Sequence, residues 1–133
     1  MGVILDTSVL IEAERGRLDI DRFINGREGQ PFGLSVITVA ELVHGVYRAD
    51  SEKRRIKRSA YVEQVIELFP IYPFGIEAAR VYAQLWATLL RQGVQIGAHD
   101  LIIASTAIAL GFSVATFDKR DFERIEGLEL EGW

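Results

Sequence analysis

The chain has 133 residues, no cysteine, and a formal net charge of −4 from 19 acidic and 15 basic residues. This length predicts a single domain over residues 1–133, and no apolar run approaches the ~20 residues of a membrane span, so we expect no contact with a membrane. The lack of cysteine excludes disulfide frameworks and thiolate metal sites and favours the cytoplasm, while the acidic charge argues against passive nucleic-acid binding, which uses basic surfaces.

The first half of the chain alternates short apolar runs with amphipathic segments. Residues 3–5 are apolar and too few for a helix, which predicts a buried strand. Thr38 and Glu41 have the spacing of a capping box, so we expect a helix to begin at Thr38. In this half we predict strands at 3–5 and 32–36 and helices at 6–16, 18–25, 38–49 and 51–68.

The second half repeats the alternation and contains a long apolar segment. Residues 101–110 are almost wholly apolar and are followed by Gly111, which predicts a central buried helix. Strands separated by helices pair in parallel, so the predicted fold class is α/β, a three-layer sandwich with a central parallel sheet flanked by helices. The other elements predicted here are an extended segment at 70–74, a helix at 76–91, a strand at 112–116, a short helix at 122–125 and a last strand at 128–130.

Four acidic residues fall near the ends of predicted strands or at the start of the apolar helix. Asp6 follows the first strand, Glu41 lies at the start of the helix after the second, and Asp118 follows the strand at 112–116. Asp100 opens the apolar helix. Parallel α/β sheets bind their ligands at the carboxyl ends of the strands, so a shared site is expected there. Each acid also has a structural alternative, as a helix cap, a capping-box partner, a turn residue or a first-turn acid beside a helix dipole.

Placed together, the four carboxylates need a compensating ion. At ~4 Å and an effective dielectric of ~20, each like-charged pair costs on the order of 4 kcal/mol. An all-oxygen cluster suits a hard cation, Mg²⁺ or Mn²⁺, better than zinc or copper. Such an ion holds phosphates and activates water for in-line attack, and it would draw an RNA backbone to an otherwise acidic protein.

Four segments, in order along the chain, carry a family resemblance. They are Val-Ile-Leu-Asp-Thr-Ser-Val-Leu-Ile at 3–11, Ser-Val-Ile-Thr-Val-Ala-Glu-Leu at 35–42, Asp-Leu-Ile-Ile-Ala at 100–104 and Ala-Thr-Phe-Asp-Lys-Arg-Asp-Phe-Glu-Arg-Ile-Glu-Gly-Leu at 115–128. With the terminal Trp133, the chain resembles the PIN-domain ribonucleases, particularly the VapC toxins of type II toxin–antitoxin pairs. The resemblance extends over essentially the whole chain.

The resemblance implies a PIN-like sandwich fold and a metal-dependent endoribonuclease with Mg²⁺ or Mn²⁺ as its cofactor. It implies hydrolysis of RNA phosphodiester bonds by a metal-activated water, leaving a 5′-phosphate and a 3′-hydroxyl. The implied partners are the RNA substrate, a second copy of the chain in a homodimer, and a cognate VapB-type antitoxin whose tail covers the site in a hetero-oligomer. The implied site residues are Asp6, Glu41, Asp100 and Asp118 for catalysis and metal binding, and Thr7, Ser8 and Thr116 for orienting ligands or substrate.

Several other residues keep two interpretations. His99 and Asp121 neighbour the acidic quartet and either contribute to the site or have a structural role. The basic stretch at 48–58 is either a solvated helix face or a contact for RNA phosphates, and Arg54 and Arg55 are its candidate substrate-binding residues. A stripe at helical spacing is either core or a dimer interface: Tyr82, Trp86 and Leu89.

Three alternative functions stay open on the sequence alone. A receiver-like phosphoacceptor needs an acid pair near the first strand and a lysine on a late strand, and the predicted strands offer neither. A phosphatase with an aspartate nucleophile needs a second aspartate where Ser8 stands. A catalytically silent PIN scaffold does not need all four acids of the quartet.

Overall fold

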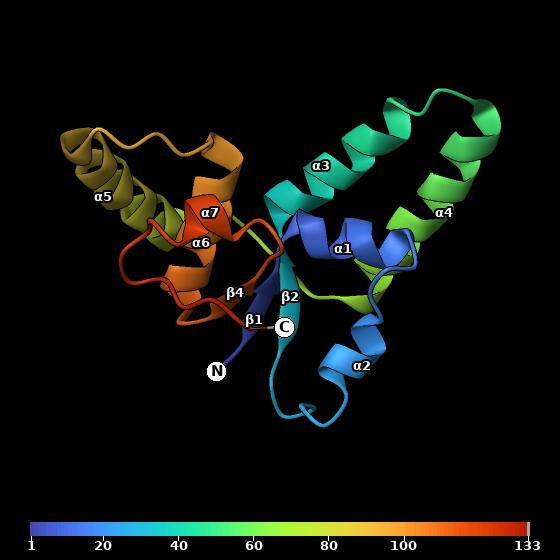
Figure 1. Cartoon of the computed structure of the whole chain (residues 1–133), viewed down its shortest axis with the longest axis horizontal. Helices are drawn as coiled ribbons and strands as arrows, with labels where there is room; N and C mark the ends of the chain where they lie inside the picture. The colour runs from blue at the N-terminus through green and yellow to red at the C-terminus, as the bar shows by residue number, and fades with distance from the viewer. Residues whose placement is uncertain (133) are drawn as a thin grey trace.

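The sheet consists of four parallel strands (Figure 1). The structure is a computed structural model that describes residues 1–132. Trp133, which forms part of the family resemblance, lies outside these residues. The predicted parallel sheet is confirmed. The strands are β1 (Val3–Leu5), β2 (Phe32–Ser35), β3 (Ile71–Tyr72) and β4 (Ser113–Ala115), in the order β3-β2-β1-β4.

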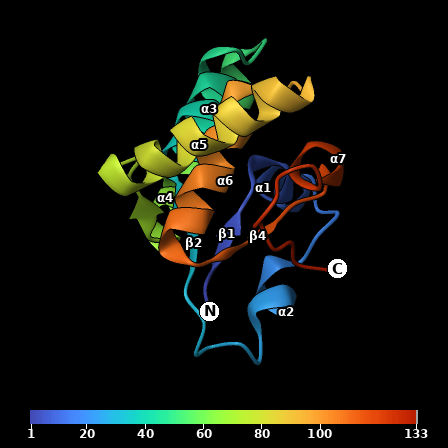
Figure 2. The same cartoon turned by 90° about the vertical axis from the view of Figure 1, so that its left-hand side faces the viewer.

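The described residues also form seven helices: α1 (Thr7–Glu14), α2 (Ile20–Ile24), α3 (Val36–Tyr47), α4 (Glu52–Leu68), α5 (Ile76–Gln92), α6 (Ala98–Leu110) and α7 (Lys119–Phe122). The core on one face of the sheet is built with α1, α3 and α4, and the core on the other face with α5, α6 and α7. Figure 2 shows α5 and α6 on one side of the strands and α1 on the other. This arrangement confirms the predicted three-layer α/β sandwich.

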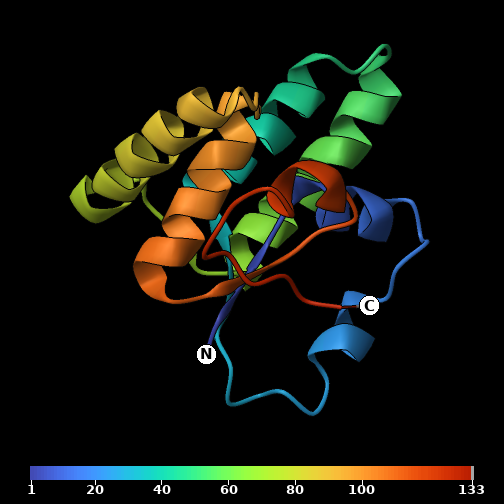
Figure 3. The ribbon, with the colours of Figure 1, turned by 60° about the vertical axis from the view of Figure 1, so that its left-hand side comes forward.

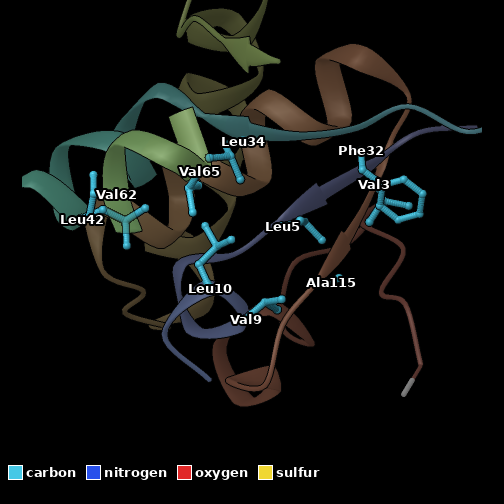
Figure 4. Close-up of a cluster of buried hydrophobic side chains, with 10 residues drawn as sticks. All are labelled: Val3, Leu5, Val9, Leu10, Phe32, Leu34, Leu42, Val62, Val65 and Ala115. Atoms are coloured by element: carbon cyan, nitrogen blue, oxygen red, sulfur yellow. The ribbon is translucent and has the colours of Figure 1, made fainter. Parts of the chain in front are cut away.

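The central strand β1 supplies side chains to both cores. Val3, Ile4 and Leu5 are fully buried. Because successive side chains of a strand point to opposite faces, Val3 and Leu5 join one core and Ile4 joins the other. The first core, drawn in Figure 4, also contains Val9 and Leu10 of α1. This packing fixes α1 against the sheet and so positions the residues at the start of that helix.

Helix α6 is the predicted central buried helix. Its Leu101, Ile103 and Ala107 are buried, and Gly111 ends it in the left-handed conformation with φ 73°. The helix begins before Leu101, so Asp100 lies inside its first turn. Neither α6 nor any other helix in the described chain has the length and apolar character needed to cross a bilayer.

The start of α3 differs from the prediction. The helix begins at Val36, and Ser35 caps it by accepting a hydrogen bond from the Ile37 amide to its Oγ at 3.2 Å. Because a capping side chain is available as soon as β2 ends, the chain enters the helix before it reaches Thr38. The expected capping box is therefore wrong, and Glu41 lies in the second turn of α3.

The last two predicted elements are also corrected. Helix α7 occupies Lys119–Phe122 rather than 122–125. The predicted strand at 128–130 is reduced to a single bridge between Val114 and Leu130. β4 is only three residues long, and its backbone bonds to the C-terminal segment through the amide and the carbonyl of Val114, each at 2.9 Å.

Candidate active site

The four predicted acids lie near the carboxyl edge of the sheet, each on a different element. Asp6 directly follows β1, Glu41 lies in the second turn of α3, Asp100 in the first turn of α6, and Asp118 between β4 and α7. Figures 1 and 3 show α1 and α7, which follow the neighbouring strands β1 and β4, lying side by side at this edge. The topology therefore gathers residues that are far apart in the sequence.

Asp6 is the buried member of the quartet, only 5% exposed. Its Oδ2 accepts hydrogen bonds from Thr116 Oγ1 at 2.7 Å and from Ser8 Oγ at 2.8 Å. Burial raises the pKa of Asp6 above its ordinary value, the two hydroxyls oppose that rise, and the charge of Glu41 adds to it. Its side chain forms no capping bond to α1, so the helix-cap alternative does not explain this carboxylate.

Thr116 and Ser8 connect Asp6 to the segment that carries Asp118. Thr116 Oγ1 accepts a hydrogen bond from the Asp118 amide at 2.9 Å, and Ser8 Oγ accepts one from the Phe117 amide at 3.1 Å. Asp118 stands at the N-cap position of α7, but its side chain makes no capping bond. The two hydroxyls thus lie between the Asp6 carboxylate and the backbone of the segment that carries Asp118.

Glu41 is held by side chains of α1 and α6. Thr7 Oγ1 donates to Glu41 Oε1 at 2.6 Å and lies 3.1 Å from Thr38 Oγ1. His99 Nδ1 lies 3.3 Å from Glu41 Oε2. Sequence reasoning assigned Thr38 to a helix cap and so missed this contact. The signal that could have revealed it is the spacing of Thr38 and Glu41, which places both on one face of a helix.

Asp100 experiences the combined charge of the site. Burial raises the pKa of Asp100 to about 6, together with the charges of four neighbouring acids: Asp6, Asp118, Asp121 and Glu41. The structure therefore brings the whole quartet within electrostatic range, and Asp121 adds to it. A strongly raised carboxyl pKa beside like charges is typical of functional sites.

The donor chemistry of the quartet suits a hard cation, because every candidate ligand atom is a carboxylate or hydroxyl oxygen. Within residues 1–132, no three Asp, Glu or His side chains stand close enough to form a complete metal cage on their own. Mg²⁺ does not need such a cage, since one or two carboxylates usually hold it while waters and substrate phosphates complete its shell. The residues present therefore fit Mg²⁺ or Mn²⁺.

The two predicted substrate-binding arginines lie on α4, away from these contacts. Arg54 pairs with Asp50 through two hydrogen bonds of 3.0 Å. Arg55 lines a groove between α3 and α4 together with Tyr47 and Ile56. In the described part of the chain, no hydrogen bond or ion pair joins either arginine to the quartet.

Comparison with known proteins shows full-length similarity to one family. The PIN domain model matches residues 3–128. Ribonuclease VapC1 of Rickettsia felis is 44% identical over 130 residues, which cover 98% of this chain and 95% of that protein. The tRNA(fMet)-specific endonuclease VapC of Salmonella typhimurium is 34% identical over 100 residues, covering 75% of this chain and 74% of that protein.

Solved structures agree with these sequence matches. The crystal structure of VapBC2 from Rickettsia felis bound to a DNA fragment from their promoter has a TM-score of 0.89 and 27% identity to this chain, and covers 100% of this chain and 99% of that one. A match to the PIN model over nearly the whole length excludes a receiver domain and an aspartate phosphatase. The chain therefore belongs to the PIN-domain family, as one of its VapC ribonucleases.

Proposed function

We propose that this ribonuclease is a metal-dependent endoribonuclease toxin that hydrolyses RNA phosphodiester bonds at the acidic quartet. The observation that carries the proposal is Asp100, whose pKa is raised to about 6 by burial and by four neighbouring acids. In the described chain, no lysine or arginine forms a salt bridge with a member of the quartet. A cation is the compensating charge that such a site requires.

The contacts of each side chain support a role for it. Asp6, oriented by Thr116 and Ser8, and Glu41, oriented by Thr7, are suited to hold a cation at a constant position. When bound, Mg²⁺ or Mn²⁺ supplies the positive charge that holds the scissile phosphate and lowers the pKa of the attacking water. The protein's contribution is to place these oxygens before the substrate arrives.

RNA outside the reacting phosphate needs positive charge that the quartet does not offer. We assign part of that contact to Arg54 and Arg55, as predicted from the sequence. The pair between Arg54 and Asp50 is 72% exposed on both sides, so a phosphate can replace the carboxylate at little cost.

The test is cleavage of cellular RNA by the purified protein with Mg²⁺, with Mn²⁺, or with a chelator. We expect cutting only with the metal, at defined positions, with 5′-phosphate and 3′-hydroxyl ends. The name of the Salmonella relative makes tRNA(fMet) the first single RNA to examine. Cutting that persists in chelator overturns the metal dependence, and a folded protein that cuts no RNA is the silent scaffold.

A VapB-type antitoxin is the partner that we propose for this chain. The Rickettsia felis structure is of a VapBC pair, and unrestrained cleavage of RNA in the cytoplasm would be harmful. A basic side chain from an antitoxin tail would be drawn to acids that pair with no lysine or arginine in the described chain. Inhibition by the cognate antitoxin should disappear when that tail is deleted; inhibition that survives the deletion rules this arrangement out.

A homodimer is the last part of the proposal. Trp86 and Leu90 on α5 are 55% and 68% exposed, and the Tyr82 ring packs edge-on against Trp86 at 5.9 Å. Leu89 is buried in the core, so the predicted stripe divides between core and surface. Exposed apolar side chains that lie together favour an interface with a second copy. Light scattering should give a dimer at micromolar concentration, and a monomer would refute this part.

A further inference from the structure

A cavity of about 130 Å³ adjoins the acidic site between α1, α3 and α4. These three helices lie together in Figure 1, with α1 across the foot of the α3–α4 pair. The cavity begins at Thr7 and Glu41, which the 2.6 Å hydrogen bond joins. Its other lining includes three arginines: Arg58 on α4, and Arg15 and Arg48 directly after the ends of α1 and α3.

The lining residues lie on one face of α1 and on one face of α3, and they extend from the quartet toward the C-terminal ends of these helices. On α3 and at its end, Glu41, Gly45 and Arg48 are four and three residues apart, which puts them on the same face. On α1, Thr7 and the residue after its end, Arg15, are likewise two turns apart. A rise of 1.5 Å per residue places Arg48 about 10 Å along the helix axis from Glu41. The cavity therefore has an acidic end and a basic end.

Arg58 is held at this cavity by long hydrogen bonds. Its Nε lies 3.4 Å from Glu14 Oε2 and its Nη1 lies 3.4 Å from the Gly45 carbonyl oxygen. A guanidinium has five N–H donors, so these two contacts leave donors for a ligand. A Cβ built at Gly45 would lie 3.8 Å from Arg58 Cδ, an ordinary van der Waals contact, so the Arg58 side chain packs over this part of α3.

Arg48 adds a charge that no other described side chain balances, since it forms neither an ion pair nor a hydrogen bond through its guanidinium in residues 1–132. Arg58 is paired with Glu14, and Arg15 lies 4.0 Å from Glu12. The basic end of the cavity thus has an excess of positive charge in a chain whose net charge is −4.

We infer that this cavity binds one phosphate of the RNA strand, other than the phosphate that is cut, through Arg48 and Arg58. The inference rests on the proposed function. A planar guanidinium matches the oxygens of a phosphate, and both Arg48 and Arg58 line this cavity. The cavity has the volume of about four waters at ~30 Å³ each, which is enough to accommodate a phosphate group. Because the basic end is separated from the quartet, this contact needs no metal.

The experiment uses a short synthetic RNA centred on the cut that the wild type makes in cellular RNA. One linkage at a time carries a methylphosphonate, which removes its negative charge, with the adjoining 2′-hydroxyl methylated to keep the linkage intact. Binding is measured in chelator to full-length Asp6→Asn protein, which should leave the strand uncut. Arg48→Ala and Arg58→Ala are added to this background. Arg91→Ala removes an exposed arginine on α5 whose side chain donates to Thr88, and it is the matched control.

We expect one methylphosphonate position, away from the cut, to weaken binding to the parent protein about tenfold. In Arg48→Ala and in Arg58→Ala, the methylphosphonate at that position should cause no additional loss of affinity. Each substitution should also reduce the steepness of log affinity against log salt by about 0.7. Arg91→Ala should behave as the parent. Arg48→Ala, whose guanidinium has no described partner to lose, tests the inference even if Arg58→Ala is unstable.

Other outcomes separate the two proposals. If the wild type cuts the unmodified RNA and no position couples to either arginine, the cavity inference is overturned while the ribonuclease activity stands. If the arginine variants bind RNA with normal affinity but no longer bind the antitoxin, the cavity is a site of protein contact and the inference is again overturned. If the wild type cuts no RNA, the proposed function itself fails.

Discussion

Two of the four carboxylates occupy N-cap positions, where an acid ordinarily caps a helix, and neither of them does so. Asp6 and Asp118 stand at N-cap positions without a capping bond from the side chain, and Glu41 belongs to no capping box. The oxygens of Asp6 and Glu41 instead accept hydrogen bonds from hydroxyls. Acidic side chains that form no capping hydrogen bond with the nearby backbone, and that repel one another, indicate a functional role rather than a stabilising one.

Replacing Thr116 with valine should damage both stability and the site. The hydroxyl donates to Asp6 at 2.7 Å and accepts from the Asp118 amide at 2.9 Å, and valine keeps the shape while removing both bonds. The buried carboxylate then loses one of its two hydroxyl donors, Ser8 being the other, so we expect the free energy of unfolding to fall by about 1–3 kcal/mol and RNA cleavage to fall with it. Thr116→Ser keeps the hydroxyl and is the control. Equal stability of the two variants in chemical denaturation would disprove the role of the hydroxyl.

Asp100 should give the metal-free protein a distinct pH dependence. Its pKa is about 6 in the native state against an ordinary value of 3.8. The native state therefore holds this proton more tightly than the unfolded chain, and its stabilising effect is complete below about pH 4 and lost as the pH rises through about 6. Two pKa units correspond to about 3 kcal/mol, which solvent screening reduces to on the order of 1 kcal/mol.

The comparison that isolates this effect is wild type against Asp100→Asn, in chelator, by chemical denaturation at several pH values. The stability of the wild type relative to the variant should decline between about pH 4 and about pH 6. A difference that stays constant, or that grows with pH, would show that Asp100 is not a carboxyl with a raised pKa.

Among the strands, the close approach of β2 and β3 depends on a glycine. A Cβ at Gly33 would clash with the Tyr72 ring and would lie 2.8 Å from the carbonyl oxygen of Pro70. A backbone oxygen cannot move aside as a side chain can, so Gly33→Ala should lower the free energy of unfolding by about 1–3 kcal/mol. Gly29→Ala, where nothing lies within 4 Å, should cost far less. Equal melting temperatures for the two variants would contradict this packing.

Sequence reasoning was reliable for elements that are marked by a single pattern, such as a continuous apolar run. The apolar run of β1 and the long apolar helix α6 were both predicted, because burial on all sides leaves a continuous pattern. It failed at the start of α3, where Ser35 and Thr38 are both good caps and the choice depends on where β2 ends. Sequence reasoning also failed at 128–130. The pairing of this segment depends on the length of β4, which the residues at 128–130 do not reveal.

The gathering of the four acids was predictable for a similar reason, since the order of strands and helices alone brings strand ends to one edge. The contacts around it were not. The bond from Thr7 to Glu41 and the approach of His99 depend on the distances between helices. The same holds for Arg48 and Arg58, which the sequence shows only as part of a basic stretch.

For the whole molecule, Mg²⁺ or Mn²⁺ should raise the melting temperature. The carboxylates repel one another in the native state, and the unfolded chain separates them. A ligand that binds only the native state at a hundredfold excess over Kd adds about 2.7 kcal/mol, or roughly 5–10 °C for a domain of this size. Asp100→Asn should reduce this response. Melting curves of the wild type that do not move with millimolar metal would mean that the quartet binds no metal before substrate arrives.

The decisive measurement is RNA cleavage by Asp6→Asn beside the wild type, with Mn²⁺ present. Asparagine keeps the size of the buried side chain and its capacity to accept from Thr116 and Ser8, but removes the charge. We expect a folded protein by circular dichroism and a loss of cleavage of at least about a hundredfold, or about 2.7 kcal/mol of barrier. Full cleavage by the folded variant, with contaminating nuclease excluded, is incompatible with a catalytic metal site at this carboxylate.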